Sequence, residues 1–124
     1  MEVKTKKILV IDDDSRNIFA LTAVLKAKKY SCVSATSAKD GFEILANDKD
    51  VAVVLMDMMM PDMDGYQAMA KMKEDPKMRT IPVIAVTAQA MVGDRERCLD
   101  AGAAGYISKP VNVDELLLKL NHYI

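Results

Sequence analysis

Short runs of apolar residues alternate along the chain with longer stretches whose apolar positions recur at helical spacing. Three runs are unbroken, residues 8–11, 51–56 and 83–86, and each ends directly before an aspartate or a threonine. Unbroken apolarity is typical of strands buried on both faces, as in a parallel sheet. Residues 31–35 are more polar and alternate, and residues 106–107 form a short run near a glycine and a proline, so we predict edge strands there.

Five stretches have helical patterns: residues 15–29, 37–47, 66–74, 90–101 and a final stretch after Asn112. Their starts carry capping residues. Either Asp14 or Ser15 suits the first helix, Ser37 with Asp40 has the spacing of a capping box, and Asn112 suits the last helix. Five strands alternating with five helices predict a doubly wound α/β fold, a parallel sheet with helices on both faces.

Composition and charge restrict the class of protein. A chain of 124 residues that is 51% hydrophobic and 28% charged fits one globular domain over residues 1–124. The net charge of -1 argues against nucleic-acid binding by this chain itself. Residues 1–7 are polar and basic, unlike a signal peptide, and no apolar run approaches the roughly 20 residues of a membrane span. We therefore expect a cytoplasmic protein without membrane association.

The cysteines and the single histidine suggest no site of their own. Cys32 and Cys98 are far apart and have no metal-binding spacing, so we expect reduced, half-buried thiols. His122 falls in the last predicted turn, where a cation is favourable at a helix C-terminus. We expect a surface residue there rather than a phosphodonor histidine.

Polar or charged side chains follow four of the predicted strands. Asp12 and Asp13 follow the first strand, Asp57 the third, Thr87 the fourth and Lys109 the fifth. In a doubly wound sheet, ligands bind outside the carboxyl ends of the strands. If the first and third strands are neighbours, the three carboxylates meet at one edge. Their repulsion would raise the pKa of at least one of them and favour a hard divalent cation such as Mg²⁺.

A carboxylate, a lysine, a hydroxyl and a magnesium ion together match phosphoryl transfer. The carboxylate of Asp57 is ionised at neutral pH and attacks phosphorus without a general base, which gives an acyl phosphate. Magnesium and Lys109 would neutralise the phosphoryl oxygens, and Thr87 would donate a hydrogen bond to one of them. Each residue alone also fits a plainer role, as a helix cap or a surface lysine. The hypothesis depends on their joint placement.

Four segments of the chain carry a family resemblance: ILVIDDD at 8–14, VLMDMMMPDMDG at 54–65, PVIAVTA at 82–88 and GYISKP at 105–110. With these segments, the chain resembles the receiver domains of response regulators in two-component systems, such as the chemotaxis response regulator. The segments have the order and spacing of that family, and the resemblance covers nearly the whole chain. The resemblance implies a flavodoxin-like fold with strand order 2-1-3-4-5. It also implies a cis bond between Lys109 and Pro110, which is typical of the family.

The resemblance assigns roles to the residues of the strand-end group. Asp57 is the phosphoacceptor, and Lys109 contacts the phosphoryl group. Asp12 and Asp13 form the acidic pair that holds Mg²⁺, with Asp13 favoured as the direct ligand. The backbone carbonyl of Met59 completes the metal site together with the carboxylate of Asp57.

The resemblance also implies a conformational switch. Thr87 and Tyr106 are the switch pair: phosphorylation draws the Thr87 hydroxyl toward the phosphoryl group, and the Tyr106 ring turns from exposed to buried. This shifts the face made by the fourth helix, the fifth strand and the fifth helix between two conformers. Met59 and Gln89 flank the phosphoryl group in the family, and their identities leave the lifetime of the phosphorylated state open.

A receiver implies partners and is a signalling module rather than an enzyme acting on an outside substrate. The donor is a histidine kinase or a histidine phosphotransfer protein, and the output is a downstream protein or an output domain. The chain is either a single-domain regulator or a piece of a longer protein, and homodimerisation through the switching face stays open.

Three alternatives compete with this interpretation. Haloacid dehalogenase phosphatases also use an aspartate, magnesium and a lysine, but they usually have DxDx[TV] after the first strand, where this chain has DDDS. A flavodoxin-like electron carrier needs a phosphate-binding loop there, and the acidic run would repel the FMN phosphate. A degenerate receiver that only binds proteins is disfavoured because the phosphorylation site is intact in the sequence.

Overall fold

The computed structural model describes residues 6–88 and 93–123. Within these residues, five parallel strands form one sheet in the order β2-β1-β3-β4-β5. The central strands are β1 (Lys7–Ile11), β3 (Val51–Asp57) and β4 (Val83–Thr87), and the edges are β2 (Ser31–Ala35) and β5 (Gly105–Ser108). The predicted fold class, the strand order implied by the resemblance and both edge strands are therefore confirmed.

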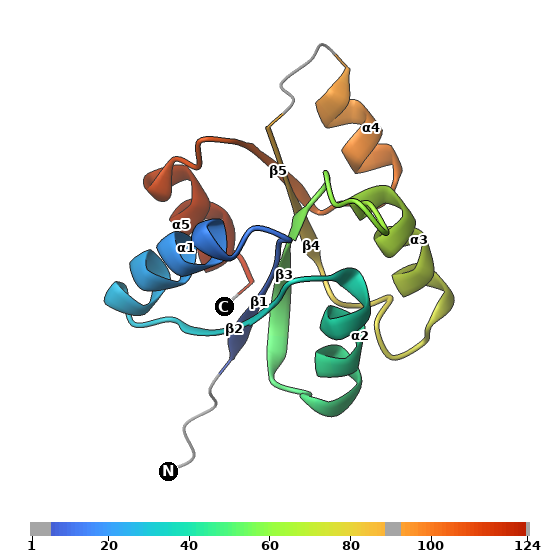
Figure 1. Cartoon of the computed structure of the whole chain (residues 1–124), viewed down its shortest axis with the longest axis horizontal. Coiled ribbons are helices and arrows are strands. Elements are labelled where there is room, and N and C mark those ends of the chain that lie inside the picture. The colour runs from blue at the N-terminus through green and yellow to red at the C-terminus, as the bar shows by residue number, and fades with distance from the viewer. Residues whose placement is uncertain (1–5, 89–92, 124) are drawn as a thin grey trace.

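Within the part of the chain that the structure describes, five helices are present, and they cover the two faces of the sheet (Figure 1). They are α1 (Ser15–Ala27), α2 (Ala38–Asn47), α3 (Gly65–Glu74), α4 (Asp94–Asp100) and α5 (Val113–Asn121). Helices α1 and α5 lie on one face, and α2, α3 and α4 lie on the other. No helix within residues 6–88 and 93–123 is long and apolar enough to cross a membrane.

The unbroken apolar runs arise because both faces of the sheet are buried. In β1, Ile8 and Val10 pack into the apolar cluster beneath α1 and α5, while Leu9 and Ile11 pack into the cluster beneath α2, α3 and α4. All four side chains are at most 2% exposed. Successive residues of a strand point to opposite faces, so a strand covered on both faces needs apolar residues at every position.

Helix starts follow the predicted caps. Asp14 caps α1 by accepting a hydrogen bond from the Arg16 amide at 2.9 Å. Ser37 caps α2, and Asn112 caps α5. The first helix was predicted over residues 15–29 but ends two residues earlier, at Ala27. Lys29 has a φ of 71°, which no α-helix accommodates.

Two further helix boundaries differ from the prediction. Helix α3 starts one residue earlier than predicted, because Asp64 and Gln67 form a reciprocal capping box around Gly65. The predicted fourth helix, residues 90–101, is shorter in the structure: α4 begins at Asp94, because Gly93 has a φ of 88°, and ends at Asp100. Its first three predicted positions, 90–92, lie outside the described residues.

The burial of Cys32 and His122 agrees with the prediction, whereas that of Cys98 does not. Cys32 is half-buried as predicted, but Cys98 is fully buried, because it faces the sheet from the inner side of α4. Burial raises the pKa of both thiols, which disfavours the reactive thiolate. His122 is exposed at the C-terminal end of α5, as expected.

Candidate functional site

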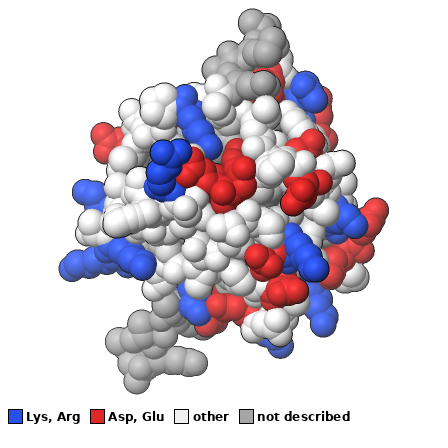
Figure 2. Space-filling view, in the orientation of Figure 1, with Lys and Arg blue, Asp and Glu red and all other residues white. Residues whose placement is uncertain are grey.

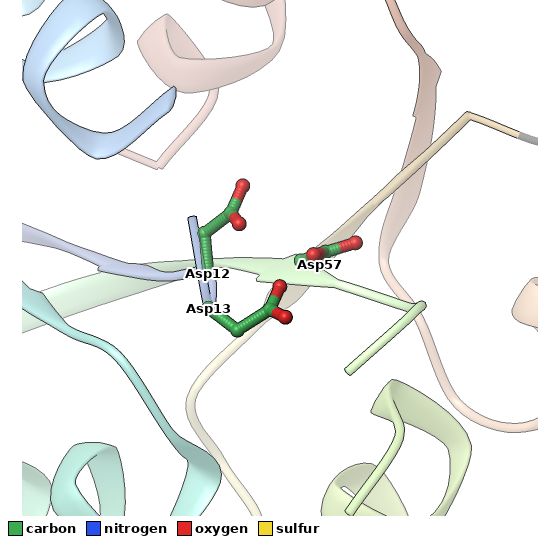
Figure 3. Close-up of side chains that lie close together, drawn as sticks. All are labelled: Asp12, Asp13 and Asp57. Carbon is green, nitrogen blue, oxygen red and sulfur yellow. The ribbon is translucent and has the colours of Figure 1, made fainter. Parts of the chain in front are cut away.

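Three carboxylates meet at the carboxyl ends of β1 and β3. Ile11 pairs with Met56 in the sheet, so the residues that follow them, Asp12 and Asp57, leave neighbouring strands at the same edge. One carboxylate oxygen from each of Asp12, Asp13 and Asp57 lies within 4.8 Å of the others (Figure 3). On the molecular surface, acidic side chains form a contiguous patch on this face with basic side chains beside it (Figure 2).

Two of these carboxylates are buried and oriented by backbone amides. Asp12 and Asp57 are 6% and 3% exposed, whereas Asp13 is exposed. The Met59 amide donates to Oδ1 of Asp57 at 3.0 Å, and the Asp14 amide donates to Oδ1 of Asp12 at 2.9 Å. Each buried carboxylate is therefore held by a bond from the residue two positions further along.

Burial makes the negative charge of Asp57 unfavourable. Burial raises the pKa of this carboxyl to about 6, and the neighbouring charge of Asp12 adds to the effect. The Met59 amide and the Lys109 ammonium act in the opposite direction. The donors are all carboxylate oxygens, which suit a hard divalent cation such as Mg²⁺, and a cation here would relieve the repulsion.

Lys109 brings a positive charge to the same edge. Its Nζ atom lies 3.4 Å from Oδ2 of Asp12 and 3.7 Å from Oδ1 of Asp57. The Lys109 amide donates to the Thr87 carbonyl at 2.7 Å, and the Lys109–Pro110 bond is cis, as the resemblance implied. The lysine is thus fixed by its backbone to the end of β4.

Thr87 and Tyr106 lie on one face of the sheet. Tyr106 is opposite Ala85 in the register of β4 and β5, and both pack with the apolar cluster under α3 and α4. Thr87, two residues after Ala85, points to the same side and is 2% exposed. The Tyr106 ring is half-buried, and its hydroxyl donates to Oδ2 of Asp94 at 3.1 Å.

The resemblance implied that Met59 and Gln89 flank the phosphoryl group, and the structure describes only Met59. The Met59 side chain is 53% exposed beside the acidic group. Gln89 lies outside the described residues.

Sequence reasoning missed Asp94, a buried carboxylate in the first turn of α4. It accepts hydrogen bonds from the hydroxyls of Tyr66 and Tyr106. An aspartate in the first turn of a helix is favourable for the helix dipole alone. Its position therefore gave no signal that two distant tyrosines converge on it.

Comparisons with known proteins show which family the chain is similar to. The family model of the response regulator receiver domain matches residues 8–121. The polar-differentiation response regulator DivK of Brucella ovis is 32% identical over 120 residues, which cover 97% of each chain.

Among solved structures, a CheY-like receiver domain protein from Methanospirillum hungatei is 31% identical, with a TM-score of 0.82 over 94% of this chain and 91% of that one. The receiver domain of the sensor histidine kinase PA1611 from Pseudomonas aeruginosa is 30% identical, with a TM-score of 0.85 over 95% and 96% of the chains. That structure has a magnesium ion in its active site cleft. The chain described here belongs to the response regulator receiver domain family of two-component signalling proteins.

Proposed function

We propose that the chain, as one receiver unit, is a phosphorylation switch in which Asp57 accepts a phosphoryl group in a Mg²⁺-dependent reaction. The observation that carries the proposal is the surroundings of Asp57. Its carboxylate is 3% exposed, lies beside two further carboxylates, and has the Lys109 ammonium 3.7 Å away. A buried nucleophile flanked by a cation and by ligands for a second cation suits a reaction that concentrates negative charge.

The residues that would hold the magnesium ion are Asp12, Asp13 and Asp57, together with the backbone carbonyl of Met59. Support comes from the oxygen-only donors within 4.8 Å of one another and from the magnesium ion in the Pseudomonas relative. When bound, Mg²⁺ supplies positive charge that stabilises the transferring phosphoryl group.

The transfer itself uses the side chains of this chain. An Asp57 carboxylate oxygen attacks the phosphorus of a phosphohistidine, a P–O bond forms, and the P–N bond breaks with its electron pair left on the imidazole nitrogen. The Lys109 ammonium stabilises the charge on the phosphoryl oxygens, and the Thr87 hydroxyl donates a hydrogen bond to one of them. Hydrolysis of the acyl phosphate returns Asp57 to its starting state.

The phosphoryl group would act on the rest of the domain through Thr87 and Tyr106. As the Thr87 hydroxyl moves toward the phosphoryl oxygens, the Tyr106 ring moves into the space beside it and becomes fully buried. The two conformers of the face formed by α4, β5 and α5 then change in population. The position of both residues on one side of the sheet supports this step.

Membership of the receiver family supports the choice of partners. The donor would be a histidine kinase or a histidine phosphotransfer protein, and the output a downstream protein or an output domain. The family match also removes the phosphatase and electron-carrier alternatives. A receiver that only binds proteins, without phosphorylation, is the remaining alternative.

Intact mass measurement after incubation with Mg²⁺ and acetyl phosphate tests the proposal. We expect one phosphoryl adduct on the parent, none on Asp57→Asn, and none when a chelator removes the metal. Asp62→Asn, which changes an exposed carboxylate in the loop after β3, is the matched control and keeps the adduct. An unmodified parent with acetyl phosphate and with a phosphorylated histidine donor would favour the binding-only receiver.

A further inference from the structure

Asp94 connects three elements through one carboxylate. Its Oδ1 accepts a hydrogen bond from the Tyr66 hydroxyl of α3 at 3.2 Å, and its Oδ2 accepts one from the Tyr106 hydroxyl of β5 at 3.1 Å. Asp94 itself is in the first turn of α4 and is 8% exposed. Hydrogen bonds to a buried ionised acceptor are stronger than neutral ones, and losing one is costly.

Two further residues of α4, one turn after Asp94, also hold the Tyr66 side chain. The Tyr66 hydroxyl lies 3.5 Å from Sγ of Cys98, and the Arg97 guanidinium lies 4.9 Å from the centre of the Tyr66 ring, a cation–π contact. Helices α3 and α4 are side by side on one face of the sheet (Figure 1). Three residues of α4 therefore fix Tyr66, while Asp94 alone among them also bonds Tyr106.

Helix stability alone does not account for this arrangement. A carboxylate near a helix N-terminus is favourable when it is exposed, and Glu96 in the same turn is exposed. Burying Asp94 is unfavourable unless hydrogen bonds replace its hydration. Both tyrosine pKa values are raised, mainly by burial, so both hydroxyls stay protonated and able to donate.

The pairing of β3, β4 and β5 also connects Tyr106 with the proposed phosphoacceptor. Asp57 pairs with Val86, and Thr87 follows Val86 at the end of β4. Thr87 and Tyr106 share one side of the sheet, with Ala85 directly opposite Tyr106. If the Tyr106 ring moves toward Thr87, either its bond to Asp94 breaks or the first turn of α4 moves with it.

We infer that Asp94 is the positioning residue of the proposed switch: its carboxylate ties the Tyr106 hydroxyl to α4, so that movement of the ring and displacement of α4 are one event. The inference rests on the proposed function, because a phosphoryl group on Asp57 drives the movement. Without Asp94, Tyr106 still responds to phosphorylation, but α4 does not follow.

Two readouts in the same sample test the inference. Fluorine NMR of 3-fluorotyrosine-labelled protein reports on Tyr106, with the four tyrosine signals assigned from Tyr→Phe variants. Amide hydrogen exchange of residues 94–100 reports on α4. Both are measured with and without acetyl phosphate and Mg²⁺, and intact mass gives the phosphorylated fraction of each sample, so that variants are compared at equal phosphorylation.

In the parent, we expect phosphorylation to shift the Tyr106 signal and to change the exchange of α4. In Asp94→Ala, exchange of α4 is faster from the outset, by roughly tenfold or more for the loss of a charged hydrogen bond. Phosphorylation then shifts the Tyr106 signal without a further change in α4. Glu96→Ala, the matched control, keeps the parent response. Should Asp94→Ala not fold, Tyr106→Phe removes the same bond, and α4 should again stay unresponsive.

If Asp94 only stabilised α4 and did not couple it to Tyr106, the result would be different. Exchange of α4 would then speed up in both states, while its response to phosphorylation stayed the same as in the parent. That outcome, or an equal loss of response in Glu96→Ala, overturns the inference and leaves the proposed function intact. A parent that forms no adduct with any donor overturns the proposed function, and the inference with it.

Discussion

The Nζ atom of Lys109 lies 3.7 Å from Oδ1 of Asp57, although the strands before these residues are separated in the sheet by β4. The Lys109 amide is bonded to the carbonyl at the end of β4, and this bond turns the lysine back toward β3. The fold thus places a cation beside a buried carboxylate. The pKa of Asp57 is raised by burial and by Asp12, and the lysine limits this increase.

Replacement of Lys109 by Met should slow phosphorylation while leaving the metal ligands in place. Removing one preorganised positive group from a site of developing negative charge costs roughly 10²-fold in rate. The rate of adduct formation with acetyl phosphate, followed by intact mass, measures the effect. Lys71→Met, which changes an exposed lysine of α3, is the control. A Lys109→Met rate equal to the parent rate would rule out this role for the lysine.

Asp57→Asn should stabilise the metal-free protein above about pH 6. Burial raises the pKa of Asp57 from its ordinary 3.8 to about 6, so the folded state binds the proton more tightly than the unfolded chain does. The parent therefore loses stability as the pH rises from about 4 through 6, on the order of 2 kcal/mol, and the variant does not.

Urea unfolding in the presence of a chelator, across this pH range, measures that difference. The difference in unfolding free energy between variant and parent should be small near pH 4 and should reach its full size near pH 7.5. A difference that does not vary with pH would contradict the raised pKa. Addition of Mg²⁺ at the higher pH should stabilise the parent more than the variant.

Magnesium should raise the melting temperature of the parent, because a ligand that binds only the folded state stabilises it. Asp13→Asn should weaken this effect by roughly tenfold in the Mg²⁺ concentration required, since fewer ligand charges lower affinity. Asp13 is exposed, so the variant should fold normally. Asp62→Asn serves as the control in the same thermal titration. Equal titrations for Asp13→Asn and the parent would place the metal elsewhere.

Gly65→Ala should destabilise the loop that follows Asp57. A Cβ atom at Gly65 would lie 2.9 Å from the backbone Cα of Met58, which cannot move without disturbing β3. We expect a loss of about 2 kcal/mol in unfolding free energy, as for other overpacked sites. A Cβ at Gly105 would meet nothing closer than 3.7 Å, so Gly105→Ala should change stability much less. Denaturant unfolding of the two variants compares them, and equal losses would contradict this account.

The sheet and most helix starts were predictable because the signals are local. Unbroken apolarity marks the central strands, and Asp14, Ser37 and Asn112 each cap a helix with their own side chain. Strand order was not accessible from periodicity, since it depends on contacts between distant segments. It came instead from the resemblance of four motifs.

The acidic group was predictable for a related reason. Asp12, Asp13 and Asp57 each follow a strand directly, and the carboxyl ends of parallel strands share one edge. The role of Asp94 was not predictable, because Tyr66 and Tyr106 reach it from two different elements. Full burial of Cys98 was also missed, since the weak amphipathicity of α4 does not show which side faces the sheet.

Direct mapping of the modified residue tests whether Asp57 is the phosphoacceptor. Borohydride reduces an acyl phosphate to an alcohol, so a phosphorylated aspartate becomes homoserine, which peptide mass mapping locates. After treatment with Mg²⁺ and a phosphodonor, we predict homoserine at position 57 alone, and none when a chelator is present. Homoserine at position 12 or 13, or a phosphoryl group retained on Thr87 or His122, would contradict the assignment of Asp57 as the phosphoacceptor.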